Sequence, residues 1–157
     1  MRALLVAIAA LLLTTINFNL QANDSAPYLR IIEIGDYYTS YEVIITKTDK
    51  PIGNISFTID KKYLEGDDNF ITNYNGFLTY GYSLNQTTGK ETQHNISNTY
   101  PTIKSDGKVL FIAKLQQSVP AGEYAAFSGG LSIGKAKFPK NFNIEKYLAT
   151  KCLLEAK

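Results

Sequence analysis

The stretch Lys108–Gln116, KVLFIAKLQ, shows the pattern that decides the fold. The side chains at alternate positions of this stretch are all apolar: Val109, Phe111, Ala113 and Leu115. The intervening positions become polar at Lys114 and Gln116. Successive side chains of a β-strand point to opposite faces of the sheet, so this period of two predicts a strand with one buried face.

The same period recurs elsewhere in the chain. Val43 is flanked at alternate positions by Tyr41 and Ile45, and a second run has apolar residues at Ile55, Phe57 and Ile59. β-branched and aromatic side chains of this kind fit the pleated surface of a sheet. We predict eight strands in all, at residues 28–34, 40–48, 53–60, 76–84, 92–98, 108–116, 122–128 and 131–138.

Glycine- and proline-rich turns separate these runs. Gly122 lies in one such turn, and Gly129–Gly130 suits a two-residue hairpin because glycine adopts the positive φ that such hairpins require. Short strands separated by turns are typical of a sandwich or a barrel. We therefore predict an all-β, antiparallel β-sandwich of the immunoglobulin-like class, with about seven to eight strands.

The end of the chain has a different pattern. Residues 141–156 carry apolar side chains at helical spacing, at Ile144, Tyr147, Leu148 and Cys152. This spacing predicts a short C-terminal helix that packs on the sheet.

One segment resembles known folds. Val119–Tyr124, VPAGEY, resembles the tyrosine corner of immunoglobulin-like sandwiches, which implies that the Tyr124 hydroxyl bonds to upstream backbone. Extended to Phe127, the segment also resembles a strand of the small-molecule effector-binding domains related to gyrase inhibitors and SOUL haem-binding proteins. That α+β fold is the alternative, and it implies a helix near residues 50–65. The alternation of Ile55, Phe57 and Ile59 favours a strand there instead.

The N-terminus has the order of a secretory signal peptide. A positive start at Arg2 precedes the apolar run Ala3–Leu13, and a more polar stretch ends at the small residue Ala22. We predict a signal peptide at residues 1–22, a single β-rich globular domain at residues 23–157, and a secreted or periplasmic location. No later apolar run has the length of about 20 residues that a membrane span needs, so we expect none in the mature chain.

Composition narrows the classes of function. Without Arg2, 15 basic and 14 acidic residues remain, so we expect no nucleic-acid partner. Cys152 is the single cysteine and has no partner for an internal disulfide, so we interpret it as a half-buried structural thiol. His94 is the single histidine, and we interpret it as a solvent-facing strand residue. We therefore expect no enzyme, no metal site and no cofactor.

Two charged segments have structural interpretations. Asp67 and Asp68 lie in the most acidic short segment, which could bind calcium, but its spacing does not match an EF-hand loop and favours a solvated turn. Lys135, Lys137 and Lys140 form a basic run, which we interpret as a guard against aggregation on a terminal strand.

Tyrosine and asparagine gather in two predicted loops. Tyr37 and Tyr38 lie in the first loop, and Tyr74 and Asn75 in the second. This mixture is typical of recognition loops, because tyrosine adds contact area at low entropic cost. We predict an exported, non-catalytic binding domain for an extracytoplasmic protein, glycan or small ligand. The alternatives are a structural or adhesive pilin-like subunit, with strand 28–34 as a donor, and a small-molecule effector-binding domain.

Overall fold

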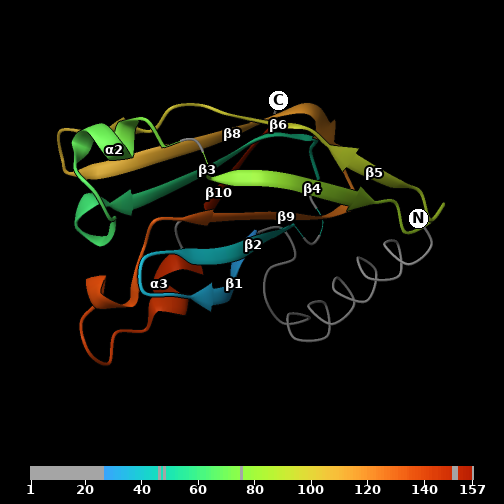
Figure 1. The fold of residues 1–157 in the computed structure, drawn as a ribbon. Coiled ribbons are helices and arrows are strands. Elements are labelled where there is room, and N and C mark those ends of the chain that lie inside the picture. The colour runs from blue at the N-terminus through green and yellow to red at the C-terminus, as the bar shows by residue number, and fades with distance from the viewer. Residues whose placement is uncertain (1–26, 46, 48, 75, 150–151, 157) are drawn as a thin grey trace.

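The computed structural model describes residues 27–45, 47, 49–74, 76–149 and 152–156. The predicted signal peptide at residues 1–22, the start of the predicted domain at residue 23, and Asn75 lie outside the described residues. The described chain forms two antiparallel sheets (Figure 1). The first has the strand order β1 (Tyr28–Ile34), β2 (Thr39–Ile45), β9 (Tyr124–Leu131), β4 (Leu78–Leu84), β5 (Glu91–His94). The second has the order β10 (Cys152–Ala156), β3 (Ile52–Asp60), β8 (Lys108–Val119), β6 (Ile96–Asn98), and β7 (Thr102–Ile103) also pairs with β8.

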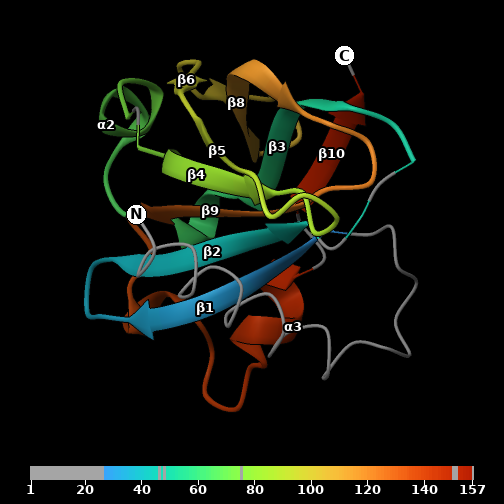
Figure 2. The ribbon, with the colours of Figure 1, turned by 90° about the vertical axis from the view of Figure 1, so that its right-hand side faces the viewer.

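This architecture confirms the predicted sandwich-like, mainly β class. Neighbouring strands pair antiparallel in both sheets, as in the β2–β9 and β3–β8 pairs. The helix that the effector-binding alternative requires near residues 50–65 is largely replaced by a strand, because Ile52–Asp60 form β3. In Figure 2 the strands β3 and β10 run steeply across the direction of β2 and β9.

The core lies between the two sheets and contains the side chains that the alternating sequence pattern predicted to be buried. Each of these side chains is at most 3% exposed: Tyr41, Val43, Ile45, Ile55, Phe57, Ile59, Val109, Phe111, Ala113 and Leu115. Aromatic rings join the layers at its centre. The Phe57 ring lies 5.8 Å from that of Phe77 and 6.3 Å from that of Tyr41, centroid to centroid. Contacts of this kind add to the hydrophobic gain from burial.

The amide side chain of Asn98 links the two sheets along one seam. The chain passes from β5 in the first sheet to β6 in the second around Asn95. At the end of β6, Asn98 Nδ2 donates to the Leu78 carbonyl at 2.6 Å, and Leu78 N donates to Asn98 Oδ1 at 3.2 Å. Through these two bonds the Asn98 side chain takes the place of a backbone peptide group that would pair β6 with β4.

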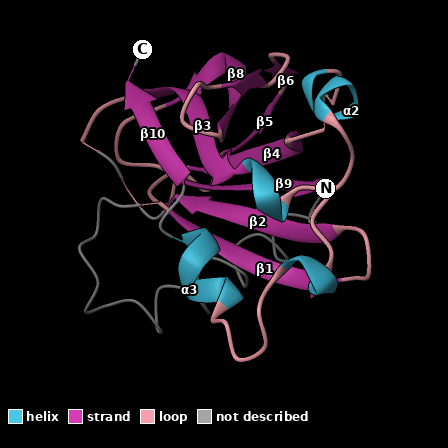
Figure 3. Ribbon diagram, turned by 90° about the vertical axis from the view of Figure 1, so that its left-hand side faces the viewer, coloured by secondary structure: helices cyan, strands magenta, loops and turns pink. Residues whose placement is uncertain are grey.

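The helix α3 (Ile144–Ala149) contacts β1 on a different side of the molecule from α2 (Asp68–Thr72), as Figure 3 shows. Leu148 of α3 is 1% exposed and belongs to the core. Tyr147 packs its ring at 5.0 Å from that of Tyr63, next to Phe138 and Phe142. These four rings anchor the C-terminal segment beside the end of β3.

The predicted C-terminal helix is present but shorter than expected. It begins after Asn143, whose side chain accepts from Lys146 N at 2.8 Å, and it ends at Ala149. The residues from Cys152 onward form β10, and Cys152 stands opposite Phe57 of β3. These residues form a strand rather than more helix, and pairing with β3 gives their backbone N–H and C=O groups hydrogen-bond partners at the edge of the sheet.

The predicted hairpin at Gly129–Gly130 is wrong, because β9 runs through both residues. A Cβ atom on Gly129 would lie 2.0 Å from the Phe77 carbonyl oxygen, and one on Gly130 would lie 1.9 Å from the Tyr38 hydroxyl. These glycines therefore permit close approach rather than a turn. Gly122 does lie in a turn, between β8 and β9, with φ of 80°.

The predicted strand at residues 131–138 is also wrong. Leu131 ends β9, and the 3-10 turn η2 (Lys135–Lys137) follows it. Because there is no strand at these residues, the interpretation of Lys135 and Lys137 as guards of a terminal strand is also wrong. Lys137 instead forms an ion pair with Glu65.

Tyr124 does not make the predicted corner bond within the described part of the chain. No hydrogen bond of its hydroxyl to another described residue is formed, and its ring packs on Ile44 and Leu84. These two residues form a small apolar cluster that is separate from the main core.

Candidate functional site

Two of the predicted binding residues meet at one point, although they come from different loops. The Tyr74 hydroxyl donates to the Gly130 carbonyl at 3.1 Å, and the Tyr38 and Ser132 hydroxyls lie within hydrogen-bonding reach of it. Gly130 lacks a side chain, so Tyr38 can lie directly against β9. Tyr37 is 76% exposed and takes no part in this contact.

A small cleft opens beside Tyr74. It has room for little more than one water molecule, and its lining is mostly apolar: Leu64, Glu65, Phe70, Ile71, Tyr74, Phe111, Leu131 and Ser132. Sequence reasoning identified Tyr74 among these residues and missed the others. Phe111 was assigned to the core by its period, and Phe70 lies in a segment that was interpreted only by its acidic residues. The one signal in the sequence was an aromatic residue, Phe70, close to the acidic pair Asp67 and Asp68.

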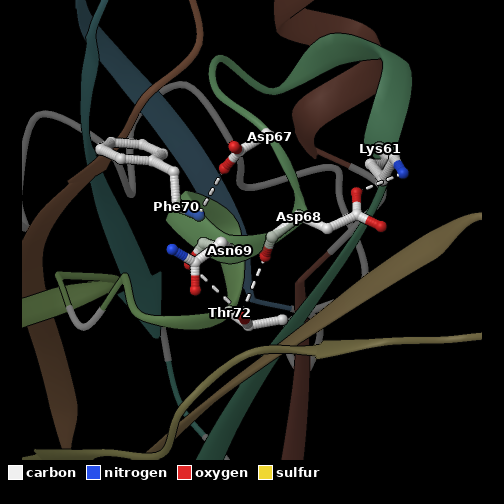
Figure 4. Close-up of polar contacts among 6 residues, drawn as sticks. All are labelled: Lys61, Asp67, Asp68, Asn69, Phe70 and Thr72. Carbon is white, nitrogen blue, oxygen red and sulfur yellow. Dashed lines mark hydrogen bonds and ion pairs between the residues drawn. The ribbon is translucent and has the colours of Figure 1, made fainter.

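The short helix α2 carries Phe70, one of the residues that line the cleft, and Figure 4 shows the polar contacts around this helix. The Asp67 carboxylate caps the helix by accepting from Phe70 N at 2.8 Å, and Asp68 pairs with Lys61. The acidic segment therefore starts a helix and holds Phe70 in place. Gly66 has φ of 89°, and a Cβ there would lie 2.4 Å from the Phe70 ring, so only glycine fits.

The segment that follows β9 ties the surrounding loops together. Glu65 N donates to the Ser132 carbonyl at 2.8 Å, and Lys135 N donates to the Gly35 carbonyl at 3.0 Å. The Lys137 ammonium lies 3.5 Å from the Glu65 carboxylate. These links join the Tyr38 loop to the cleft, so the site is organised before any ligand arrives.

Burial raises the pKa of the Tyr74 phenol well above its usual range, and the neighbouring Tyr38 adds to the effect. Burial also raises the pKa of Tyr147 to about 12; its hydroxyl lies 3.2 Å from Asp60 Oδ2. Both phenols therefore stay protonated at neutral pH, and Tyr74 acts as a hydrogen-bond donor.

We expect the protein to lose stability in alkaline solution. Unfolded tyrosine ionises near pH 10, whereas Tyr74 and Tyr147 keep their protons to higher pH when folded. The contribution of these two phenols to the free energy of unfolding is therefore complete below about pH 10 and is lost as the pH rises toward about 12. Over this range the unfolded state binds fewer protons than the folded state, so rising pH favours unfolding. Urea titrations between about pH 9 and pH 11.5 check this. Tyr147→Phe should make the decline shallower, and an equally steep decline in that variant would contradict the assignment.

The prediction that His94 faces solvent is wrong, since His94 is 1% exposed. Its Nδ1 lies 2.8 Å from the Gln117 carbonyl, and its Nε2 lies 2.8 Å from the Ser83 hydroxyl. A carbonyl only accepts, so Nδ1 carries a proton, and in the neutral ring Nε2 accepts from Ser83. Ser83 is 0% exposed, so no substrate reaches this serine–histidine pair, and its role is structural.

The chain matches no known family model, and no curated protein or solved structure is significantly similar to it. Over the described ranges, no three histidine, cysteine or acidic side chains gather as metal ligands. None of the helices in those ranges has the length and apolar character to cross a bilayer.

Proposed function

We propose that this chain is an exported, non-catalytic domain that binds a protein partner through the aromatic surface around the cleft beside Tyr74. The exposed aromatic side chains carry the proposal. The cleft itself has room for little more than one water molecule, whereas small-molecule sites generally enclose about 300–1,000 Å³. A protein surface that packs on the exposed rings therefore suits the site better than a small ligand.

The surface around the cleft supports the same function. Phe70 is 49% exposed and Tyr38 is 46% exposed, and both lie at or next to the cleft. Aromatic side chains are enriched in protein interfaces because they bury much area with few rotatable bonds. Tyr37 adds a third exposed ring on the same loop as Tyr38.

The proposal also includes export of the protein and an immunoglobulin-like fold class. The apolar run Ala3–Leu13 supports a signal peptide at residues 1–22. The two antiparallel sheets are compatible with the immunoglobulin-like class. The pilin-like alternative would use β1, which is an edge strand of the first sheet, but α3 packs against this strand. We therefore favour recognition at the cleft over donation of a strand.

Phe70→Ala is expected to weaken partner binding by about 2 kcal/mol or more, which is roughly thirtyfold, because the ring forms a wall of the cleft. The partner is first isolated by pull-down with the secreted protein and identified by mass spectrometry. Calorimetric titration then measures its affinity for each variant.

Tyr80→Ala is the matched control for this experiment. Tyr80 is 50% exposed, close to the exposure of Phe70, but it lies on β4 and does not line the cleft. We expect this variant to bind normally. If Tyr80→Ala loses binding and Phe70→Ala keeps it, the interface lies on the sheet surface and the proposal fails.

A further inference from the structure

The outer face of the first sheet, which points away from the second sheet, is rich in tyrosine. Its side chains alternate along each strand with those of the core, and strand pairing arranges them in rows across the sheet. One row contains Arg30, Glu42, Ser128 and Tyr80, and the next contains Tyr28, Ile44, Ala126, Tyr82 and Gln93. None of these residues lines the cleft beside Tyr74, so this face is a separate surface.

Tyrosine rings, rather than aliphatic side chains, are the accessible part of this face. Tyr80 is 50% exposed, whereas Ile44 is 0% exposed and Leu84 is 6% exposed. The side chains of Tyr82 and Tyr124 pack against these two aliphatic residues. The cores of protein interfaces bury apolar surface and are depleted in charged residues. A protein partner would find little aliphatic surface to bury here.

Polar side chains stand beside the accessible rings. Gln93 is exposed and pairs with Tyr82 across the β4–β5 ladder, and Ser128 is half-buried and pairs with Tyr80 across the β4–β9 ladder. An amide and a hydroxyl each donate and accept hydrogen bonds without carrying charge. The face therefore combines flat rings with neutral groups that bind hydroxyls.

The charged side chains on this face do not favour an acidic ligand. Arg30 Nη2 lies 2.5 Å from Glu42 Oε2, so these two charges neutralise each other. Glu91, which stands opposite Leu84 in the adjoining row, adds a negative charge. An anionic ligand would meet this carboxylate without a matching cation among the residues named above, whereas a neutral ligand avoids the repulsion.

We infer that the outer face of the first sheet binds a neutral oligosaccharide, with Tyr80 and Tyr82 as its contact rings. A sugar ring has C–H groups on its two faces and hydroxyl groups around its edge. The faces of aromatic rings are electron-rich and attract C–H groups of this kind, while the large ring area is shielded from water. The sugar hydroxyls reach Gln93 and Ser128.

The angle between the two rings limits the form of the glycan. The Tyr80 and Tyr82 rings lie 6.2 Å apart, centroid to centroid, with an interplanar angle of 73°. A flat polysaccharide surface would need coplanar rings to rest on. Rings at this angle form a corner, in which one ring supports the face of a sugar and the other contacts its edge. The ligand is therefore a single flexible chain of sugars.

The binding test uses the purified secreted protein and five probes. Three are neutral β-linked hexasaccharides, of glucose, mannose and N-acetylglucosamine. The fourth is hexagalacturonic acid, which is anionic, and the fifth is sorbitol, which has the hydroxyls of a sugar but no ring. The NMR shifts of the backbone amides of Tyr82, Gln93 and Ser128 report binding. We expect at least one neutral hexasaccharide to shift these amides at concentrations at which the acid and sorbitol do not.

Variants of Tyr80 separate stacking from general apolar contact. Tyr80→Leu keeps an apolar side chain but removes the ring, so it should weaken binding of the hexasaccharide about fivefold, which is the scale of one aromatic contact. Tyr80→Phe keeps the ring and should keep most of the affinity.

Tyr100→Leu is the matched control for Tyr80→Leu. Tyr100 is 68% exposed and lies between β6 and β7 of the second sheet, so it makes the same chemical change away from the proposed surface. We expect this variant to bind the hexasaccharide as the unchanged protein does. Thermal unfolding of each variant verifies that it is folded.

The contrary results are distinguishable from failure of the proposed function. If no neutral hexasaccharide shifts the three amides up to its solubility limit, or if Tyr80→Leu binds as tightly as the unchanged protein, the inference is overturned. The protein site around Phe70 is untouched by either result. If Tyr80→Leu instead loses the protein partner, the outer face is a protein interface, and both the inference and the proposed site are wrong.

Discussion

Phe57→Ala is expected to lower the free energy of unfolding by about 3–5 kcal/mol, as expected for a buried phenylalanine cut to alanine. Phe57 is 1% exposed and reaches from the second sheet into the centre of the core. Its ring contacts those of Tyr41, Phe77 and Phe111. Truncation removes these contacts from both layers at once and leaves a cavity that the rigid sheets cannot close.

Urea titration with a fluorescence or circular-dichroism signal measures this loss. Tyr100→Ala is the control, because Tyr100 is also aromatic but is 68% exposed. We expect that variant to change stability by less than about 0.5 kcal/mol. A loss below about 1 kcal/mol for Phe57→Ala would contradict the packing of the two sheets described above.

His94→Ala is expected to lower the free energy of unfolding by about 3 kcal/mol or more. Part of the loss comes from the cavity beside the Phe127 ring, whose centroid lies 5.8 Å from that of His94. The rest comes from the two polar partners, the Ser83 hydroxyl and the Gln117 carbonyl, which lose their hydrogen bonds in a buried place.

A double mutant separates the two contributions. Ser83→Ala removes the hydroxyl that His94→Ala leaves unpaired, so the double mutant should be more stable than the sum of the single losses predicts. Gln93→Ala is the control, since Gln93 is the exposed neighbour of His94 on β5. If the two losses simply add, the Ser83–His94 bond does not contribute to stability in solution.

The core of the sandwich also supports the candidate site. Phe111 belongs to β8 and Leu131 to β9, and both residues line the cleft. One wall of the cleft is therefore built on strands, which position side chains more precisely than loops do.

The sequence by itself determined which faces of the main strands are buried. Phe57 and Phe111 were placed in the core by their period alone, because alternation of side chains is a local property of an extended backbone. Tyr38 and Tyr74 were also selected by residue type, and both lie at the candidate site.

Only the tertiary structure decided what those residues contact. The pair Gly129–Gly130 is compatible with a hairpin or with close packing, and its neighbours Phe77 and Tyr38 come from distant parts of the chain. The partners of His94 and the Glu65–Lys137 pair likewise depend on strand order. Strand order follows from the lowest total free energy of packing over the whole chain, and a local pattern holds no information about its distant partners.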